Sequence, residues 1–118
     1  MPVLVYTTSV SCNKSLSKQQ WQILEFLRVK NIEYEEIDLS VNTDARSIML
    51  KKMPENKKEN ALPPQVFNED VYCGDYEAFF NAQEMRCLYT FFKLTPPENS
   101  YEERQIKKYK SQGIELKF

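Results

Sequence analysis

The first residues of the chain constrain its fold most strongly. Residues 3–8, Val-Leu-Val-Tyr-Thr-Thr, are apolar or β-branched and do not alternate with charged residues. This pattern is typical of a strand that is buried on both faces of its sheet. With 118 residues, the chain has room for one hydrophobic core and for no second domain of independent stability. The sequence therefore predicts a single domain built around an interior strand.

Helices and strands alternate after this first strand. Apolar residues at helical spacing predict a helix over residues 14–30. Residues 32–39 alternate apolar and acidic side chains, as expected of a strand with one solvated face. Thr43 or Asp44 can cap a short helix that follows. We expect the polar segment 54–60 to be a surface loop.

The second half of the pattern contains two short strands and a helical region. The strands are predicted over residues 65–67 and 70–72, and Asp75 can cap the helical region that follows. The predicted order is βαβαββα, with a central four-stranded mixed sheet flanked by helices. The aromatic residues of the last region are most simply explained as core residues: Tyr76, Phe79, Phe80, Tyr89, Phe91 and Phe92.

The composition changes sharply near residue 95. Pro96 and Pro97 precede a segment rich in charged residues, which is typical of a mobile or weakly helical tail. We therefore expect a folded domain over residues 1–94 and a tail over residues 95–118.

Composition also excludes several classes of function. The net charge is −1, so no overall field favours nucleic acid or an anionic membrane surface. The chain has no histidine, which removes Ser-His and Cys-His catalytic pairs and imidazole metal ligands. Its two glycines cannot form a glycine-rich phosphate loop, and its three widely spaced cysteines do not suggest a disulfide framework. We expect no metal and no nucleotide.

Three separated segments resemble a known family. They are the strand and loop at residues 5–12, the Pro63-Pro64 pair before the strand at 65–67, and Gly74-Asp75 at a helix start. This layout resembles that of glutaredoxins. The resemblance implies an α/β fold of the thioredoxin-like, glutaredoxin type.

The same resemblance predicts that the catalytic dithiol is missing. In glutaredoxins a Cys-x-x-Cys pair stands at the N-terminus of the first helix, where the helix dipole lowers the pKa of the thiol. The two matching positions are Ser11 and Lys14 in this chain. A serine hydroxyl without an adjacent base cannot replace a thiolate. We therefore expect a protein that is not an enzyme.

Cys12 keeps a second interpretation open. It lies one residue from the position of a catalytic cysteine, and a helix start favours a lowered thiol pKa. The alternative function is a weak monothiol glutaredoxin-like or glutathione-binding redox protein in which Cys12, or in its place Cys73, forms a mixed disulfide with glutathione.

The resemblance also predicts where a ligand or partner binds. Pro64 matches the proline that follows a cis peptide bond in glutaredoxins, and Gly74-Asp75 resembles their loop for the glutathione carboxylate. The implied binding groove consists of Ser11, Cys12, Pro63, Pro64, Gly74 and Asp75.

A closer resemblance extends over residues 2–95. The Leu-Pro-Pro-Gln-Val-Phe segment at 62–67 and the Gly-Asp-Tyr segment at 74–76, taken together, are similar to the SH3-domain-binding glutamic-acid-rich-like proteins. Those proteins resemble glutaredoxins without the active-site cysteines and are described as adaptors or modulators. The resemblance implies the same class of function here.

That family is named for a proline-rich motif that is thought to bind SH3 domains. Ala61 takes the place of the first proline of its PxxP core, whereas the PPxxF pattern shared with ligands of EVH1 domains is retained. The matching residues are Leu62, Pro63, Pro64, Gln65, Val66 and Phe67. Val66 and Phe67 also belong to a predicted strand, so a core role is the alternative to a ligand role.

We therefore expect a non-catalytic adaptor or modulator protein. Its expected partners are other proteins, with SH3- or EVH1-domain proteins as candidates, and neither nucleic acid nor a membrane. No cofactor is expected, and glutathione is the ligand of the alternative interpretation. The absence of a recognisable secretory or membrane segment predicts a cytoplasmic location, and a protein of 14.0 kDa can also enter the nucleus. We expect a monomer.

Overall fold

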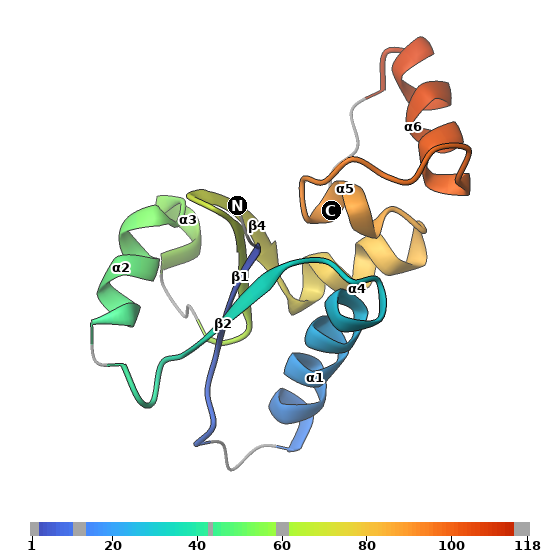
Figure 1. Cartoon of the computed structure of the whole chain (residues 1–118). Coiled ribbons are helices and arrows are strands. Elements are labelled where there is room, and N and C mark those ends of the chain that lie inside the picture. The colour runs from blue at the N-terminus through green and yellow to red at the C-terminus, as the bar shows by residue number, and fades with distance from the viewer. Residues whose placement is uncertain (1–2, 11–13, 43, 59–61, 115–118) are drawn as a thin grey trace.

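A computed structural model describes residues 3–10, 14–42, 44–58 and 62–114 (Figure 1). Its central element is a four-stranded mixed sheet flanked by helices, which confirms the predicted thioredoxin-like fold class. The elements in chain order are β1 Val3–Thr7, α1 Lys14–Val29, β2 Tyr34–Asp38, α2 Ala45–Lys52, α3 Glu55–Lys58, β3 Gln65–Asn68, β4 Val71–Asp75, α4 Tyr76–Glu84, α5 Leu88–Phe91 and α6 Tyr101–Ser111.

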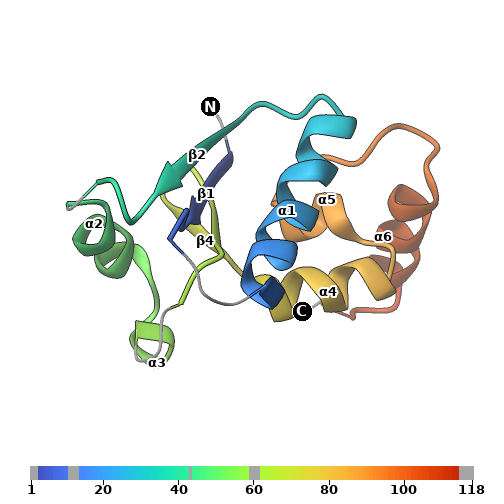
Figure 2. The same ribbon diagram turned by 90° about the horizontal axis from the view of Figure 1, so that it is seen from below.

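The strands lie in the order β2-β1-β3-β4. Strand β1 is parallel to β2 and antiparallel to β3, and β3 is antiparallel to β4. Helices α1, α4 and α5 lie on one side of the sheet, and α2 and α3 lie on the other (Figure 2). The predicted interior strand is therefore interior, because β1 has a strand on each edge and helices over each face.

Alternation along the strands divides the core into two clusters. Val5 and Val66 point to the face covered by α1, α4 and α5, where they pack against Phe79 among other residues. Tyr6 and Phe67 point to the opposite face and pack against α2. Most of the aromatic residues predicted to lie in the core do so: Phe79, Phe91 and Phe92 are fully buried, Tyr76 and Tyr89 are partly buried, and Phe80 is exposed.

Three local features differ from the sequence prediction. The polar segment predicted as a loop at 54–60 contains the short helix α3. Strand β4 continues past Gly74 to Asp75. At the start of α2 the side chain of Asp44 caps nothing, whereas Oδ1 of Asn42 accepts the backbone N–H groups of Asp44 and Ala45. The other predicted cap, Thr43, lies outside the described residues. The predicted Asp75 cap of α4 is present, because its Oδ1 accepts the N–H of Ala78.

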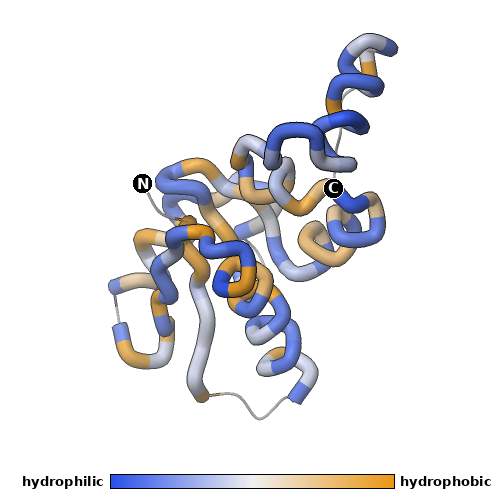
Figure 3. Tube along the Cα trace, turned by 45° about the vertical axis from the view of Figure 1, so that its right-hand side comes forward, coloured by the Kyte–Doolittle hydropathy of each residue, from blue (hydrophilic) through white to orange (hydrophobic). Residues whose placement is uncertain are grey.

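The segment predicted as a mobile or weakly helical tail contains helix α6. Figure 3 shows that this helix, at the upper right, is mostly hydrophilic. One of its residues is nevertheless buried, since Glu102 is only 6% exposed. The Glu102 carboxylate accepts the backbone N–H groups of Tyr89 and Thr90 and the hydroxyl of Thr90. It therefore caps helix α5, for which the preceding residue provides no side-chain cap.

Gly74 is required by the packing between β4, α4 and α5. Its φ angle is +147°, and a Cβ atom added there would lie 2.7 Å from Cβ of Ala78 and 3.0 Å from Cε1 of Phe91. Real Cβ atoms do not approach other carbons so closely, and L-amino acids rarely adopt this backbone conformation. Any side chain at this position must therefore displace helix α4 or α5.

We predict that Gly74→Ala lowers the free energy of unfolding by roughly 3 kcal/mol, from overpacking and backbone strain together. Gly113→Ala is the matched control, because Gly113 also has a positive φ, of +72°, but no atom within 4 Å of the added Cβ. Its cost should be at most about 1 kcal/mol. Urea unfolding of both variants measures the difference, and equal costs would contradict the packing argument.

Candidate functional site

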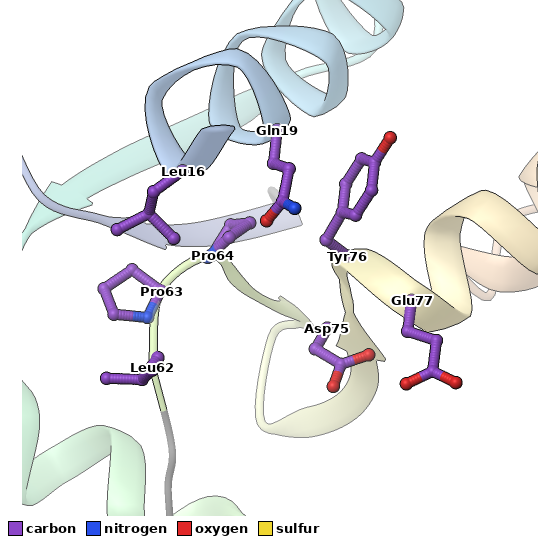
Figure 4. Close-up of a pocket in the computed structure, with 8 residues that line it drawn as sticks. All are labelled: Leu16, Gln19, Leu62, Pro63, Pro64, Asp75, Tyr76 and Glu77. Carbon is purple, nitrogen blue, oxygen red and sulfur yellow. The ribbon is translucent and has the colours of Figure 1, made fainter. Parts of the chain in front are cut away.

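A cleft opens where the start of α1, the turn before β3 and the start of α4 meet (Figure 4). Its volume is about 270 Å³. The residues that line it are Leu16, Gln19, Leu62, Pro63, Pro64, Asp75, Tyr76 and Glu77. The fold thus brings together three residues of the groove predicted from sequence, Pro63, Pro64 and Asp75.

Of the other predicted groove residues, only Gly74 belongs to the part of the chain that the structure describes, and it does not line this cleft. Gly74 is buried behind it, against Ala78 and Phe91. Lys14 is exposed at the first position of α1 and is not part of the lining. Ser11 and Cys12 lie outside the described residues.

The wall formed by the two prolines is fixed by the side chain of Gln65. The Pro63-Pro64 peptide bond is cis, and both prolines are buried. Gln65 is 4% exposed, and its Nε2 donates to the carbonyl of Leu62 at 2.8 Å while its Oε1 accepts the hydroxyl of Tyr72 at 2.7 Å. One buried amide therefore ties the turn that carries Leu62 to strand β4.

The wall formed by α1 is tied to β1 and α4. The side chain of Gln20 accepts the N–H of Thr8 at 2.9 Å and donates to the carbonyl of Thr8 at 3.1 Å, so it binds the end of β1 as a neighbouring strand would. Tyr76 of α4 donates its hydroxyl to Gln22 at 2.7 Å. These hydrogen bonds fix α1 relative to the end of β1 and to α4, which forms another wall of the cleft.

The segment after β1 is also held by Asp38. The Asp38 carboxylate accepts the N–H and hydroxyl of Ser40 and the N–H of Ser9. These hydrogen bonds stabilise the ionised form and hold the pKa of Asp38 well below its ordinary value, with Ser40 as the main cause and Ser9 next. Asp38 therefore joins Ser9, which follows β1, to Ser40, which follows β2.

Leu62 was predicted only as part of the proline-rich motif. Four other lining residues were not predicted, although the sequence contains signals for some of them. Tyr76 and Glu77 directly follow the predicted cap Asp75, in the first turn of α4. Leu16 is one of the apolar residues at helical spacing in α1, but it is only partly buried and lines the cleft together with Gln19. Their direction depends on the rotation of each helix against the sheet, which sequence spacing does not determine.

Comparison with known proteins determines the family. A family model described as SH3-binding, glutamic acid-rich protein matches residues 1–95. The chain belongs to this family. A solved structure described as C. albicans actin interacting protein Aip5 is similar to the chain with a TM-score of 0.59 and 20% sequence identity, over 77% of this chain and 87% of that chain. At this identity, the similarity to Aip5 supports the fold alone.

The proline-rich segment of this family member is part of the core. Residues 63–67 are buried, and Val66 and Phe67 are completely inaccessible to solvent. Only Leu62, which is 65% exposed, projects from the segment. A ligand of an SH3 or EVH1 domain must present its prolines on an exposed polyproline II helix, so the folded chain does not present the predicted motif in that form.

The two cysteines within the described residues are poor nucleophiles. Cys73 packs against the cluster beneath α1, α4 and α5 and does not line the cleft. Burial raises the pKa of its thiol to about 11. Cys87 is buried, and desolvation followed by the charge of Glu102 also raises its thiol pKa. Neither thiol has the thiolate character that disulfide chemistry requires.

The described part of the chain contains no cluster of three or more histidine, cysteine, aspartate or glutamate residues that could hold a metal ion. Among the same residues, no helix is both long and apolar enough to span a membrane.

We predict that Cys73 resists alkylation in the folded protein. With a pKa of about 11, roughly one Cys73 in a thousand is a thiolate near pH 8, whereas a free cysteine ionises substantially there. Iodoacetamide treatment followed by peptide mass spectrometry should find Cys73 unmodified in native protein and fully modified in guanidinium chloride. Rapid labelling of native Cys73 would show that the thiol is accessible and ionised.

Proposed function

We propose that this chain is a non-catalytic protein-interaction module that binds a segment of another protein in the cleft between α1, the Pro63-Pro64 turn and α4. The cleft carries the proposal, because it is a defined hollow with an apolar wall and is fixed by buried hydrogen bonds from Gln65 and Gln20. The name of its family, which refers to SH3 binding, and the description of Aip5 as an actin interacting protein are consistent with a role in protein interaction.

The burial of the proline-rich segment favours the cleft over that segment as the binding surface. An SH3 or EVH1 domain would have to extract Val66 and Phe67 from between β1 and β4, which means unfolding the centre of the sheet. The cleft needs no such opening. SH3- and EVH1-domain proteins therefore remain candidate partners only if they bind a surface of this chain other than its proline-rich segment.

The non-catalytic part of the proposal rests on the side chains available. Ser11 and Lys14 occupy the positions of the dithiol in the resemblance to glutaredoxins, and the thiols of Cys73 and Cys87 are stabilised in their protonated forms. The chain has no histidine to act as a general base. Cys12 is the remaining thiol on which the alternative, a monothiol redox protein, depends.

Glutathione does not fit the cleft well. Glutathione carries two carboxylates and one ammonium group at neutral pH, so its carboxylates need positively charged or N–H partners. The lining residues include the carboxylates of Asp75 and Glu77 and no lysine or arginine. We therefore propose that the module works without this cofactor.

Selection from a phage-displayed library of random peptides tests the binding function. We expect peptides that bind the full chain and shift the backbone amide resonances of Gln19, Tyr76 and Glu77 when titrated into isotope-labelled protein. Amide shifts confined to the far side of the sheet, around α2, would place binding elsewhere. A selection that yields no specific binder would also contradict the proposal.

A further inference from the structure

The two walls of the cleft have different chemistry. Leu16, Leu62 and Pro63 form an apolar wall from α1 and the turn before β3. Figure 4 shows the carboxylates of Asp75 and Glu77 together on the other side, where β4 passes into α4. An occupant that complements both walls must present an apolar group on one side and a positive charge on the other.

Both carboxylates are available to a ligand. Asp75 uses Oδ1 to cap α4 by accepting the N–H of Ala78 at 3.1 Å, and its Oδ2 has no hydrogen bond within the described residues. Glu77 is exposed and has neither a hydrogen bond nor an ion pair in the same part of the chain. Within the described residues no lysine or arginine lines the cleft, so this part of the lining does not neutralise the two negative charges.

The apolar wall is exposed at Leu62, whereas Leu16 is partly buried and Pro63 is buried. Leu62 is 65% exposed although it adjoins the buried residues 63–67. Its backbone is fixed, because its carbonyl accepts a hydrogen bond from Gln65. A ligand that covers Leu62 therefore gains apolar burial without having to order this part of the chain.

We infer that the cleft binds an extended segment of a partner protein in which an arginine lies next to proline or aliphatic residues. The arginine guanidinium pairs with the carboxylates of Asp75 and Glu77, since its planar fork can donate to two carboxylates at once. The adjacent apolar side chains pack on Leu16, Leu62 and Pro63. This inference rests on the proposed function and specifies the chemistry of the partner.

The charge of the cleft also determines what it rejects. An acidic segment would place like charges beside two carboxylates that have no positive neighbour in the lining. Binding of the arginine segment should weaken as the salt concentration rises, because salt screens its ion pairs with Asp75 and Glu77 at the open rim of the cleft.

The test begins with the strongest binder from the random-peptide selection. We expect the selected peptides to be enriched in arginine next to proline or aliphatic residues. Versions of the strongest binder with arginine replaced by glutamine or by glutamate are then titrated into the isotope-labelled full chain. The glutamine version should bind about threefold more weakly and the glutamate version at least about tenfold more weakly.

Glu77→Lys is the informative protein variant, because Glu77 is exposed and caps nothing, whereas replacing Asp75 would remove the α4 cap. Glu84→Lys is the matched control, since Glu84 is an exposed residue at the other end of α4 and does not line the cleft. We expect Glu77→Lys to weaken the arginine peptide about tenfold and to improve binding of the glutamate version. Glu84→Lys should change neither affinity by more than about twofold.

The outcomes separate this inference from the proposed function. In one outcome, the selected peptides shift the cleft amides but show no enrichment in arginine and bind Glu77→Lys and Glu84→Lys equally well. That result would overturn the inference and leave the proposed function standing. Absence of any peptide that shifts the cleft amides would overturn both. Shifts of those amides that depend on protein concentration alone would identify a second copy of the chain as the occupant and would also overturn the inference.

Discussion

The burial of residues 63–67, in strand β3 and the turn that precedes it, is the constraint on which the rest of the structure depends. Strand β3 lies between β1 and β4, and its residues Val66 and Phe67 pack into opposite core clusters. The same segment holds the exposed Leu62 and the turn that forms one wall of the cleft. Core and cleft therefore share one short stretch of chain, which cannot leave the sheet without disrupting both.

This constraint explains why the folded chain does not present the proline-rich motif at residues 62–67 as a polyproline II ligand. A proline pair followed by apolar residues is compatible both with a polyproline II ligand and with the start of a strand. Local sequence cannot distinguish these alternatives, because burial is determined by the strands that pair on either side. In the folded chain Val66 and Phe67 have no accessible surface, and the second alternative holds.

The fold was predictable where the relevant signal is local. Helix α1 occupies nearly the predicted residues, since apolar residues at helical spacing indicate it. Strand β1 lies inside the sheet, as its apolar run without alternation predicts. The features that were missed depend on residues far apart in the chain. Gln20 binds Thr8 twelve residues before it, and Glu102 caps a helix that begins fourteen residues before it. The short helix α3 was missed because its residues are all polar or charged.

The candidate site was partly predictable for a similar reason. The family resemblance placed Pro63, Pro64 and Asp75 in one groove, since the fold fixes their backbone positions. Leu16 and Glu77 enter the lining through helix rotation, which local sequence does not fix. These two residues nevertheless determine the chemistry of the cleft, apolar on one side and acidic on the other. In the proposed function, the fold therefore fixes the position of the cleft, and its individual side chains determine which partner chemistry the proposal names.

The central claim is that this chain keeps a glutaredoxin-type scaffold for binding and has lost its redox chemistry. A glutathione-coupled disulfide reduction assay tests it most directly, with the native protein, Cys12→Ser and the double variant Ser11→Cys/Lys14→Cys compared side by side. The account predicts no turnover by the native protein or Cys12→Ser, and measurable turnover by the double variant. Native turnover that disappears in Cys12→Ser would contradict the account and make the chain a monothiol enzyme.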